Sequence, residues 1–247
     1  MVALTKDQIF EKLNKHGAII SNSHVVLTPK PDGFYHSAGY FTKDEVFCRP
    51  QILLSIANLI ALEFNNDKVD MVVGPTAGAV GPAAVVALRL HEMRGREIFW
   101  GYAEEKTKSI TVCPVVEGLP MPQEQITVVE KGVRVVKRVF PKYIEGGKNV
   151  LIIEDVASSG GSVLATIKAV REAGGEVIGV AVVCNRAGIT AKDLGVPKLF
   201  TLFDIPIQMF KEEECPLCAQ NIPIEMGVGH GEDFYSRHPG SQVPRKV

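Results

Sequence analysis

Two adjacent carboxylates followed by a run of small residues form the segment of this sequence best suited to chemistry. Glu154 and Asp155 come directly after an apolar run at residues 150–153, and a turn rich in hydroxyls and glycine follows them. Backbone N–H groups converge where such a turn opens a helix, and the helix dipole favours negative charge there. The two carboxylates can accept hydrogen bonds from vicinal hydroxyls. The segment therefore predicts a site for a sugar phosphate. The members of the turn are Ala157, Ser158, Ser159, Gly160, Gly161 and Ser162.

The elements on either side of this turn are predicted to be a strand and a helix. The short unbroken apolar run at 150–153 is typical of a strand buried on both faces of a parallel sheet. Residues 163–173 have apolar side chains at helical spacing, and Gly174 and Gly175 can end that helix. The alternative is an ordinary strand–turn–helix with two solvated acids. A simple turn needs neither the paired acids nor this many small residues, so we favour the phosphate site.

A second turn of the same kind lies earlier in the chain. The predicted strand at residues 69–73 leads into Gly74, Thr76, Ala77 and Gly78, and an Ala/Val-rich helix follows. A plain tight turn is again the alternative. Two such turns at the carboxyl ends of buried strands favour one common site, because ligands of open α/β sheets collect at that edge. Neither turn has the glycine pattern of a P-loop or of a dinucleotide-binding turn.

Size and composition exclude several classes of protein. The 247 residues suit one large α/β domain, or one domain with a small extension. A net charge of -1 with no basic block gives no electrostatic case for nucleic-acid binding. No apolar run reaches membrane-spanning length, and the N-terminus turns polar too early for a secretory signal. Five thinly spread cysteines do not suggest a disulfide framework, so a cytoplasmic location is expected.

The segment around Glu154 and Asp155 resembles the phosphoribosyl-pyrophosphate (PRPP) motif of the type I phosphoribosyltransferases, with serines where that family usually has threonines. A second stretch is similar to the N-terminal segment of orotate phosphoribosyltransferases: Leu27, Lys30, Phe34, Tyr35, Ala38 and Gly39 follow its order. The resemblance covers most of residues 5–225. It implies an α/β fold with a mainly parallel central sheet flanked by helices. It also implies an N-terminal hood at 1–45, a core at 46–210 and a C-terminal tail at 211–247.

The resemblance also implies an activity and a set of site residues. The reaction joins a nitrogenous base, by resemblance orotate, to the ribose of PRPP and releases pyrophosphate. Mg²⁺ would be carried by PRPP with no assigned protein ligand, and the enzyme would be a homodimer. The catalytic candidates are Glu154, Asp155, Lys106, Lys137 and Arg138, and residues 157–162 would bind the 5′-phosphate. Pyrophosphate would meet Gly74, Thr76, Ala77, Gly78 and Lys30, and the base would meet Phe34, Tyr35 and Arg186.

The predicted flap at residues 104–140 departs from the usual orotate pattern. Family members carry a loop here that often reaches into the neighbouring subunit's site and supplies lysine, arginine and usually histidine. This chain has no histidine between His91 and His230. Two alternatives therefore stay open: transfer to another base such as a purine, or a PRPP-binding regulator without catalysis.

The tail carries a Cys-x-x-Cys pair, Cys215 and Cys218. Such a pair is half of a zinc site, a redox pair, or an inert structural pair. No second Cys-x-x-Cys exists in the chain. His230 and His238 are the histidines that could complete four ligands, although their spacing fits no recognised zinc site. The sequence favours a structural or inert pair.

Overall fold

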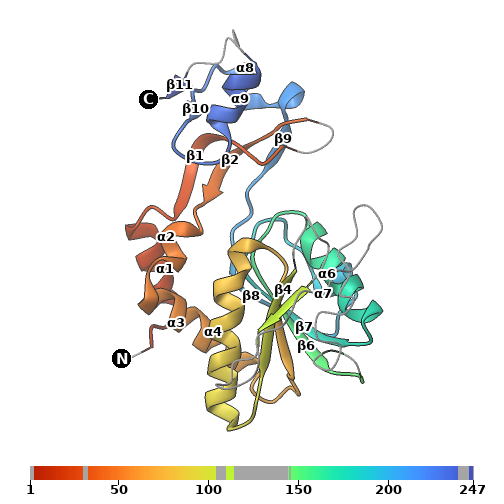
Figure 1. Ribbon diagram of the computed structural model, residues 1–247. Coiled ribbons are helices and arrows are strands. Elements are labelled where there is room, and N and C mark those ends of the chain that lie inside the picture. Colours follow the sequence, from red (N-terminus) through yellow and green to blue (C-terminus); the bar gives the residue numbers. More distant parts are fainter. Residues whose placement is uncertain are drawn as a thin grey trace. The chain divides into compact units, whose positions relative to one another are not determined.

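The computed structural model describes residues 3–29, 33–103, 110–113, 144, 146–238 and 245–246 (Figure 1). The chain forms two compact units. The first, which we call the core unit, consists of Met1–Ile9 and Phe47–Ile205; the second, the hood unit, consists of Phe10–Val46 and Pro206–Val247. The predicted hood and the predicted tail thus belong to one unit. Helices α1 (Lys6–Lys15) and α2 (Asp44–Phe47) cross the boundaries between the units.

The core unit is built on a six-stranded sheet in the order β5-β4-β3-β6-β7-β8. All neighbouring strands are parallel except β5, which runs antiparallel to β4. The strands are β3 (Met71–Gly74), β4 (Phe99–Ala103), β5 (Ile110–Cys113), β6 (Asn149–Ala157), β7 (Glu176–Asn185) and β8 (Leu199–Asp204). Their near-continuous apolar sequences suit strands that are covered on both faces.

Helices cover both faces of this sheet, and the order of the strands explains why. The helices are α3 (Pro50–Glu63), α4 (Ala77–Arg94), α6 (Gly161–Glu172) and the short α7 (Ala191–Leu194). The β3–α4–β4 connection leads from the middle of the sheet toward one edge, whereas the β6–α6–β7 connection leads toward the other edge. Right-handed crossovers then place α4 and α6 on opposite faces, as Figure 1 shows. The strand order therefore reverses between β3 and β6.

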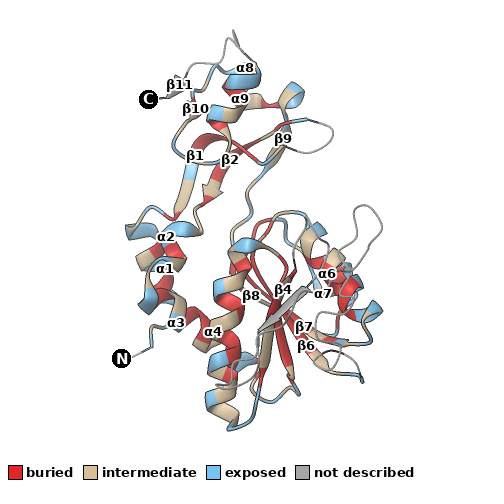
Figure 2. Cartoon of the chain, in the orientation of Figure 1, coloured by how far each residue is buried: buried red, intermediate tan, exposed pale blue. Residues whose placement is uncertain are grey.

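The buried residues of the core unit are concentrated on the inner strands and on the helix faces that cover them (Figure 2). Strand β6 contributes Val150 and Ile152, and β7 contributes Val180 and Val182, all buried in one cluster with Val163 of α6. The prediction of a parallel sheet flanked by helices is confirmed. Strand β6 is longer than predicted: it continues through Glu154 and Asp155 and ends at Ala157, because its partner β7 pairs with it to Asn185.

The hood unit contains a five-stranded sheet in the order β11-β10-β1-β2-β9. Its strands are β1 (Ile19–Val26), β2 (Tyr35–Phe41), β9 (Met209–Lys211), β10 (Ile224–Glu225) and β11 (Arg245–Lys246). Strand β1 is continuous, with an irregular register between Ser21 and Val25. Strands β1 and β2 form an antiparallel hairpin. Strand β9 flanks this hairpin on one side, and β10 and β11 lie on the other. Residues from both ends of the sequence therefore form one sheet.

Small helical elements complete the hood unit: the 3₁₀ turn η1 (Glu212–Glu214), α8 (Pro216–Ala219) and α9 (Gly231–Arg237). Phe34 is only 7% exposed and packs edge-on against Phe234 of α9, with 5.2 Å between the ring centroids. Val26, Ile224 and Tyr235 belong to the same apolar cluster. This cluster attaches the C-terminal helix to the hairpin.

The surroundings of the Cys-x-x-Cys pair differ from the sequence-based suggestion. His230 accepts or donates a hydrogen bond at Thr28, and His238 lies at the backbone carbonyl of Phe234. The histidines that approach Cys215 and Cys218 are instead His24 and His36, both fully buried. They come from the hairpin, far from the cysteines in sequence, which is why spacing along the chain did not reveal them.

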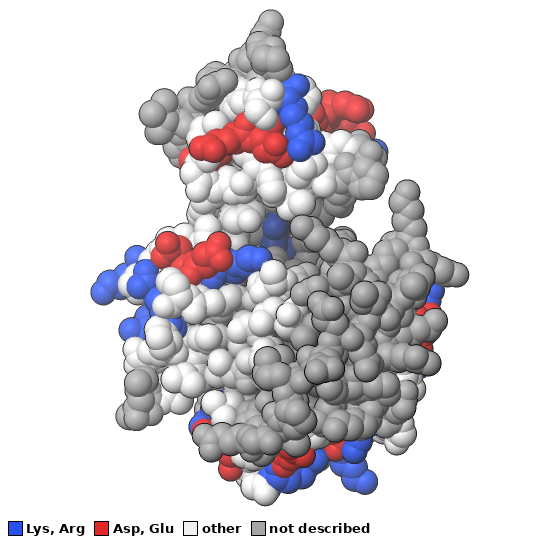
Figure 3. Space-filling view, in the orientation of Figure 1, with Lys and Arg blue, Asp and Glu red and all other residues white. Residues whose placement is uncertain are grey.

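The surface of the described residues mixes charges of both signs. On the face in Figure 3, acidic and basic side chains lie beside one another. This distribution agrees with a net charge of -1. Among the helices that the structure describes, none is long and apolar enough to cross a membrane.

Candidate active site

The reversal of strand order between β3 and β6 brings the two predicted phosphate turns together. The strands are direct neighbours, with Met71 opposite Val150 and Val73 opposite Ile152. Because β3 ends at Gly74 while β6 runs on to Ala157, the turn after β3 lies beside the acidic pair. The Thr76 hydroxyl donates a hydrogen bond to Glu154 Oε1 at 3.0 Å and lies 3.5 Å from Asp155 Oδ1. Ligands of open α/β sheets bind at such reversal points.

Glu154 and Asp155 are almost completely buried, at 2% and 4% exposure. Burial raises the pKa of Glu154 well above its usual range, and the neighbouring Asp155 carboxylate raises this pKa further. Two carboxylates this close in a desolvated place cannot both ionise without cost. A ligand that brings hydroxyl donors or positive charge to this point would relieve that cost.

Backbone groups fix the direction of both carboxylates. The Val156 N–H donates to Asp155 Oδ1 at 2.8 Å, and the Asp155 N–H donates to Glu154 Oε1 at 3.3 Å. With Thr76, these contacts hold the acids in place before any ligand arrives. Such preorganisation lowers the free energy needed to arrange the groups around a reacting sugar.

The turn after β6 has the form that anion binding requires. Gly160 caps the N-terminus of α6 with φ of +72°, a left-handed conformation, and no side chain caps the helix. A β-carbon at Gly160 would lie 3.1 Å from Ile189 Cδ1, so glycine is favoured there for space as well. Ser159 is exposed, and Ser158 and Ser162 are partly exposed. The first N–H groups of α6 and these hydroxyls can thus reach a phosphate.

The turn after β3 repeats this arrangement at α4. Thr76 is the N-cap residue of α4, but its side chain bonds the acids rather than capping the helix. Gly74 is required by close packing: a β-carbon there would lie 2.8 Å from the Ala79 carbonyl oxygen. The turn therefore runs tightly onto the first turn of α4, where uncapped N–H groups of Ala77 and Gly78 suit a second anionic group.

Arg186 completes the described part of the site at the end of β7. Its backbone N–H donates to the Ala157 carbonyl at 2.9 Å, which ties it to the start of the phosphate turn. Its side chain is only 7% exposed. Contact between Arg186 and the base stays a prediction.

This geometry is accompanied by a family match over two thirds of the chain. The family described as "Phosphoribosyl transferase domain" matches residues 43–207. The chain belongs to the phosphoribosyltransferase family. The matched range begins just before α2 and ends just after β8, so it includes both turns and the acidic pair.

Relatives that align with this chain over almost their full length are named orotate phosphoribosyltransferases. An orotate phosphoribosyltransferase from Caldicellulosiruptor bescii is 32% identical over 221 residues, which cover 90% of this chain and 96% of the relative. The orotate phosphoribosyltransferase of Thermotoga maritima is 29% identical over 223 residues, covering 90% of this chain and 98% of the relative. Sequence similarity thus extends beyond the core into both ends of the chain.

Solved structures support the fold. Orotate phosphoribosyltransferase from Aeropyrum pernix superposes with a TM-score of 0.51 at 22% identity, covering 78% of this chain and 92% of that one. The Mycobacterium tuberculosis enzyme in complex with inorganic phosphate gives a TM-score of 0.52 at 20% identity, covering 80% and 94%. Both share with this chain the phosphoribosyltransferase fold.

Several predicted site residues of this phosphoribosyltransferase cannot be placed. Lys30, Lys106, Lys137 and Arg138 lie outside the described residues. Of the two aromatic candidates for the base, Phe34 is a packing residue of the hood unit, whereas Tyr35 is partly exposed. Packing of Phe34 leaves Tyr35 as the better candidate for contact with a planar base.

Sequence reasoning missed one residue that shapes the site. Asn185, at the end of β7, donates to the Ile189 carbonyl at 3.1 Å and accepts from the Ile189 N–H at 3.1 Å. It also donates to Asp204 at 3.0 Å. These bonds fix the loop whose Ile189 packs against Gly160. A strand-end asparagine just before Arg186 was the only sequence signal, because a loop bond of this kind has no fixed spacing.

Proposed function

We propose that this phosphoribosyltransferase transfers the phosphoribosyl group of PRPP to orotate, giving orotidine 5′-monophosphate and pyrophosphate. The observation that carries the proposal is the convergence of Thr76, Glu154 and Asp155 between two uncapped helix N-termini. PRPP has two phosphate-bearing ends joined by a ribose with vicinal hydroxyls, which is the pattern that this arrangement fits. The names of the full-length relatives support orotate as the base.

Each helix N-terminus would take one end of PRPP. The turn at 157–162 would bind the 5′-phosphate through backbone N–H groups and serine hydroxyls. The turn at 74–78 would bind pyrophosphate, whose charge grows as the bond to ribose C1 breaks. Fixed N–H donors aimed at that developing charge lower the barrier without reorganising during the reaction.

The acidic pair would act on the sugar between them. Glu154 and Asp155 would accept hydrogen bonds from the ribose 2′- and 3′-hydroxyls and so position C1 for attack by the base nitrogen. As the bond to pyrophosphate stretches, C1 and the ring oxygen gain positive character. Negative charge nearby stabilises that state electrostatically, and no protein nucleophile is needed.

Magnesium is the expected metal, and the donors present fit it. All side-chain donors at this point are oxygens, from Thr76, Glu154 and Asp155, and hard oxygen donors are what Mg²⁺ prefers. The ion would be carried by PRPP, with no protein ligand assigned to it, and the oxygens of Thr76, Glu154 and Asp155 would line the place to which PRPP brings it. When bound, it would neutralise part of the charge on the leaving group.

A panel of bases tests the proposal directly. The purified full chain is incubated with PRPP, Mg²⁺ and orotate, uracil, adenine, guanine or hypoxanthine, and nucleotide products are separated by chromatography. We expect orotidine 5′-monophosphate at a rate well above any other product. If product forms from a purine instead, that purine would replace orotate as the proposed base. PRPP binding without product from any base would favour a regulator.

The first prediction concerns Asp155. Asp155→Asn should lower kcat/KM for PRPP by roughly 10²-fold or more, because one preorganised charged contact is lost. The melting temperature should change little or rise, since a buried repulsion is relieved. Asp67→Asn is the matched control, since it removes only a surface ion pair with Lys198 at 3.0 Å. An unaltered kcat/KM in Asp155→Asn would remove that residue from the site.

Oligomeric state and location belong to the same proposal. We propose a homodimer, because the orotate phosphoribosyltransferases that this chain resembles often complete each site with the neighbour's flap. Light scattering coupled to size-exclusion chromatography measures this mass directly. We also propose a cytoplasmic location, which the free thiols of Cys48, Cys184, Cys215 and Cys218 support.

A further inference from the structure

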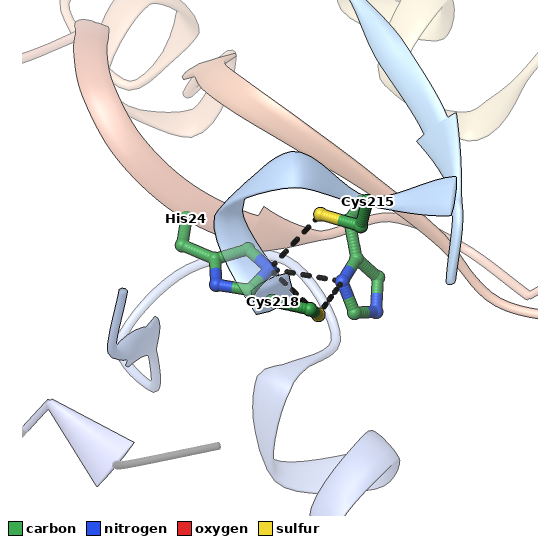
Figure 4. Close-up of side chains that lie close together, drawn as sticks. His24, Cys215 and Cys218 are labelled. Atoms are coloured by element: carbon green, nitrogen blue, oxygen red, sulfur yellow. Dashed lines mark hydrogen bonds between the residues drawn. The ribbon is translucent and has the colours of Figure 1, made fainter. Parts of the chain in front are cut away.

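Four side chains of the types that bind transition metals meet inside the hood unit. They are His24, His36, Cys215 and Cys218, and their donor atoms all lie within 4.8 Å of one another. Three of the four are buried and Cys218 is partly buried. Figure 4 shows His24, Cys215 and Cys218 directed toward one point. The proposed transferase chemistry uses none of them.

The fold holds the two histidines on one face of the hairpin. Val26 of β1 is opposite His36 of β2, so His24 is the diagonal neighbour two residues before Val26. Diagonal neighbours of an antiparallel pair share a face and lie within reach of long side chains. Their imidazoles accordingly approach to 2.9 Å between His24 Nε2 and His36 Nδ1.

The two cysteines are brought to this face by the chain's return. Strand β9 pairs with β2, with Phe210 opposite His36, and the chain then passes through η1 to Cys215. Cys215 is the N-cap residue of α8 and Cys218 lies within that helix. A Cys-x-x-Cys on such a tight turn presents both sulfurs to one side, as in many zinc sites.

The separations between donor atoms are close to those of a tetrahedral zinc site. Bonds of about 2.3 Å to sulfur and about 2.0 Å to nitrogen put the donors of such a site roughly 3.3 to 3.8 Å apart. The His24 Nε2 atom lies 3.6 Å from Cys215 Sγ and 3.7 Å from Cys218 Sγ. Cys218 Sγ lies 3.2 Å from His36 Nδ1. The two shorter separations, 2.9 and 3.2 Å, must widen by a few tenths of an ångström, and any separation near the 4.8 Å limit of the cluster must shorten when the ion enters.

A backbone contact sets the tautomer that metal binding requires at His24. Its Nδ1 lies 2.7 Å from the Ile222 carbonyl oxygen, which can only accept, so Nδ1 carries the proton. The lone pair of Nε2 then faces the other three donors. Ligand histidines are commonly oriented in this way by a carbonyl on their second nitrogen. Ile222 precedes β10, which pairs with β1 at His24, so the carbonyl is held by the sheet itself.

We propose that His24, His36, Cys215 and Cys218 bind one structural Zn²⁺ ion in the hood unit. Two imidazole nitrogens and two sulfurs are the donor set and the number that zinc prefers. Four protein donors leave no position open for substrate, so the ion has a structural and not a catalytic role. Each cysteine binds as a thiolate, and each thiol releases its proton when the metal enters.

The ion joins the two ends of the chain. Two ligands come from the first 46 residues and two from the segment after Pro206, which together form the hood unit. Without a metal, the four side chains are linked to one another by an imidazole pair and weak thiol hydrogen bonds. The ion therefore supplies stabilisation that a small sheet with two-residue strands at one edge lacks.

Metal analysis of the full chain tests this site. The protein is purified under reducing conditions without a histidine tag, and zinc per chain is measured by elemental analysis and by native mass spectrometry. We expect one zinc ion per chain. The variants Cys218→Ser and His36→Gln should lose the ion, whereas Cys48→Ser and His230→Gln, matched thiol and imidazole controls outside the cluster, should keep it.

Cobalt substitution gives a second readout that does not require the variants to fold. Wild-type protein is stripped with a chelator and titrated with Co²⁺. A tetrahedral site with two thiolates gives strong absorption bands at one equivalent, and added Zn²⁺ should remove them. Stripping should also lower the melting temperature, and Zn²⁺ should restore it.

Three results would overturn the proposal. The first is wild-type protein that contains no zinc and shows no cobalt bands. The second is zinc that persists in both Cys218→Ser and His36→Gln. The third is a Cys215–Cys218 disulfide that forms in place of metal binding under reducing conditions. None of them depends on PRPP or on a base. Failure here is therefore distinguishable from failure of the proposed transferase activity.

Discussion

At the scale of single residues, the acidic pair opposes stability in order to serve a ligand. Glu154 and Asp155 are buried side by side, and the Thr76 hydroxyl and backbone N–H groups donate hydrogen bonds to them. When folding raises the pKa of a carboxyl, the protein loses stability as the pH rises above the pKa that this carboxyl has in the unfolded chain. For Glu154 that loss begins near the usual value of 4.5 and continues up to its raised folded-state pKa. Perturbed carboxyls of this kind are concentrated at functional sites.

This reasoning predicts that Glu154→Gln makes the protein more stable and less active. The amide cannot ionise and can donate to Asp155, so the melting temperature of the ligand-free protein should rise at pH 7 to 8. The gain should shrink toward pH 4.5 and vanish below it, where the wild-type carboxyl is protonated in both states. Turnover of PRPP should fall because a ribose hydroxyl loses an anionic acceptor.

Thermal unfolding of both proteins across this pH range, with initial rates, measures the trade-off. Glu176→Gln, at the exposed start of β7, is the control and should change neither quantity. A lower melting temperature for Glu154→Gln at every pH would mean that the Glu154 carboxylate stabilises the fold.

At the scale of elements, the tight β3–α4 turn is the proposed binding site for the pyrophosphate end of PRPP. Gly74→Ala would push a β-carbon to 2.8 Å from the Ala79 carbonyl oxygen, so the strand end or the helix must shift. We expect a lower melting temperature and a rise in KM for PRPP, because the N–H groups of the turn move with the backbone.

Gly81→Ala, in the exposed part of α4 with open space around it, is the matched control. It should raise stability by about 1 kcal/mol without affecting KM. Equal effects of the two substitutions would show that close packing at Gly74 is unimportant.

The elements of the core were largely predictable because local patterns and tertiary packing agree there. In the sequence Pro50 precedes a run rich in apolar residues, and helix α3 begins at that residue, since proline suits a first helical turn. The end of β6 was placed too early, because two carboxylates suggest a solvated loop. Pairing with β7 extends the strand through them, and only the partner strand carries that information.

At the scale of the whole molecule, sequence order concealed how the hood unit is assembled. The pairs His24–Ile224 and His36–Phe210 join residues far apart in the chain. No spacing rule connects such residues in a single sequence. Half of a zinc site was therefore only one of three alternatives for the cysteine pair, and the sequence suggested His230 and His238 as further ligands, whereas His24 and His36 lie beside the cysteines. Long-range pairing of short edge strands is the part of a fold that periodicity specifies least.

The last prediction concerns the flap and the dimer. Lys106→Ala and Lys137→Ala should each lower turnover with little change in melting temperature, because a cation near departing pyrophosphate acts mainly in the transition state. Initial rates and thermal unfolding measure both. The control is Lys192→Ala, on the exposed helix α7. If neither flap variant loses activity, these lysines are ordinary surface charges.

A mixing experiment then locates the flap that serves each site. Asp155→Asn and Lys106→Ala forms of the proposed homodimer, each with lowered activity, are dissociated, mixed and reassociated. If the flap enters the neighbour's site, a mixed dimer combines one doubly defective site with one intact site. Random pairing makes half of the dimers mixed, so about a quarter of wild-type activity should return. If each flap serves its own subunit, every site keeps one defect and no activity returns. The recovered fraction therefore separates a shared active site from two independent ones.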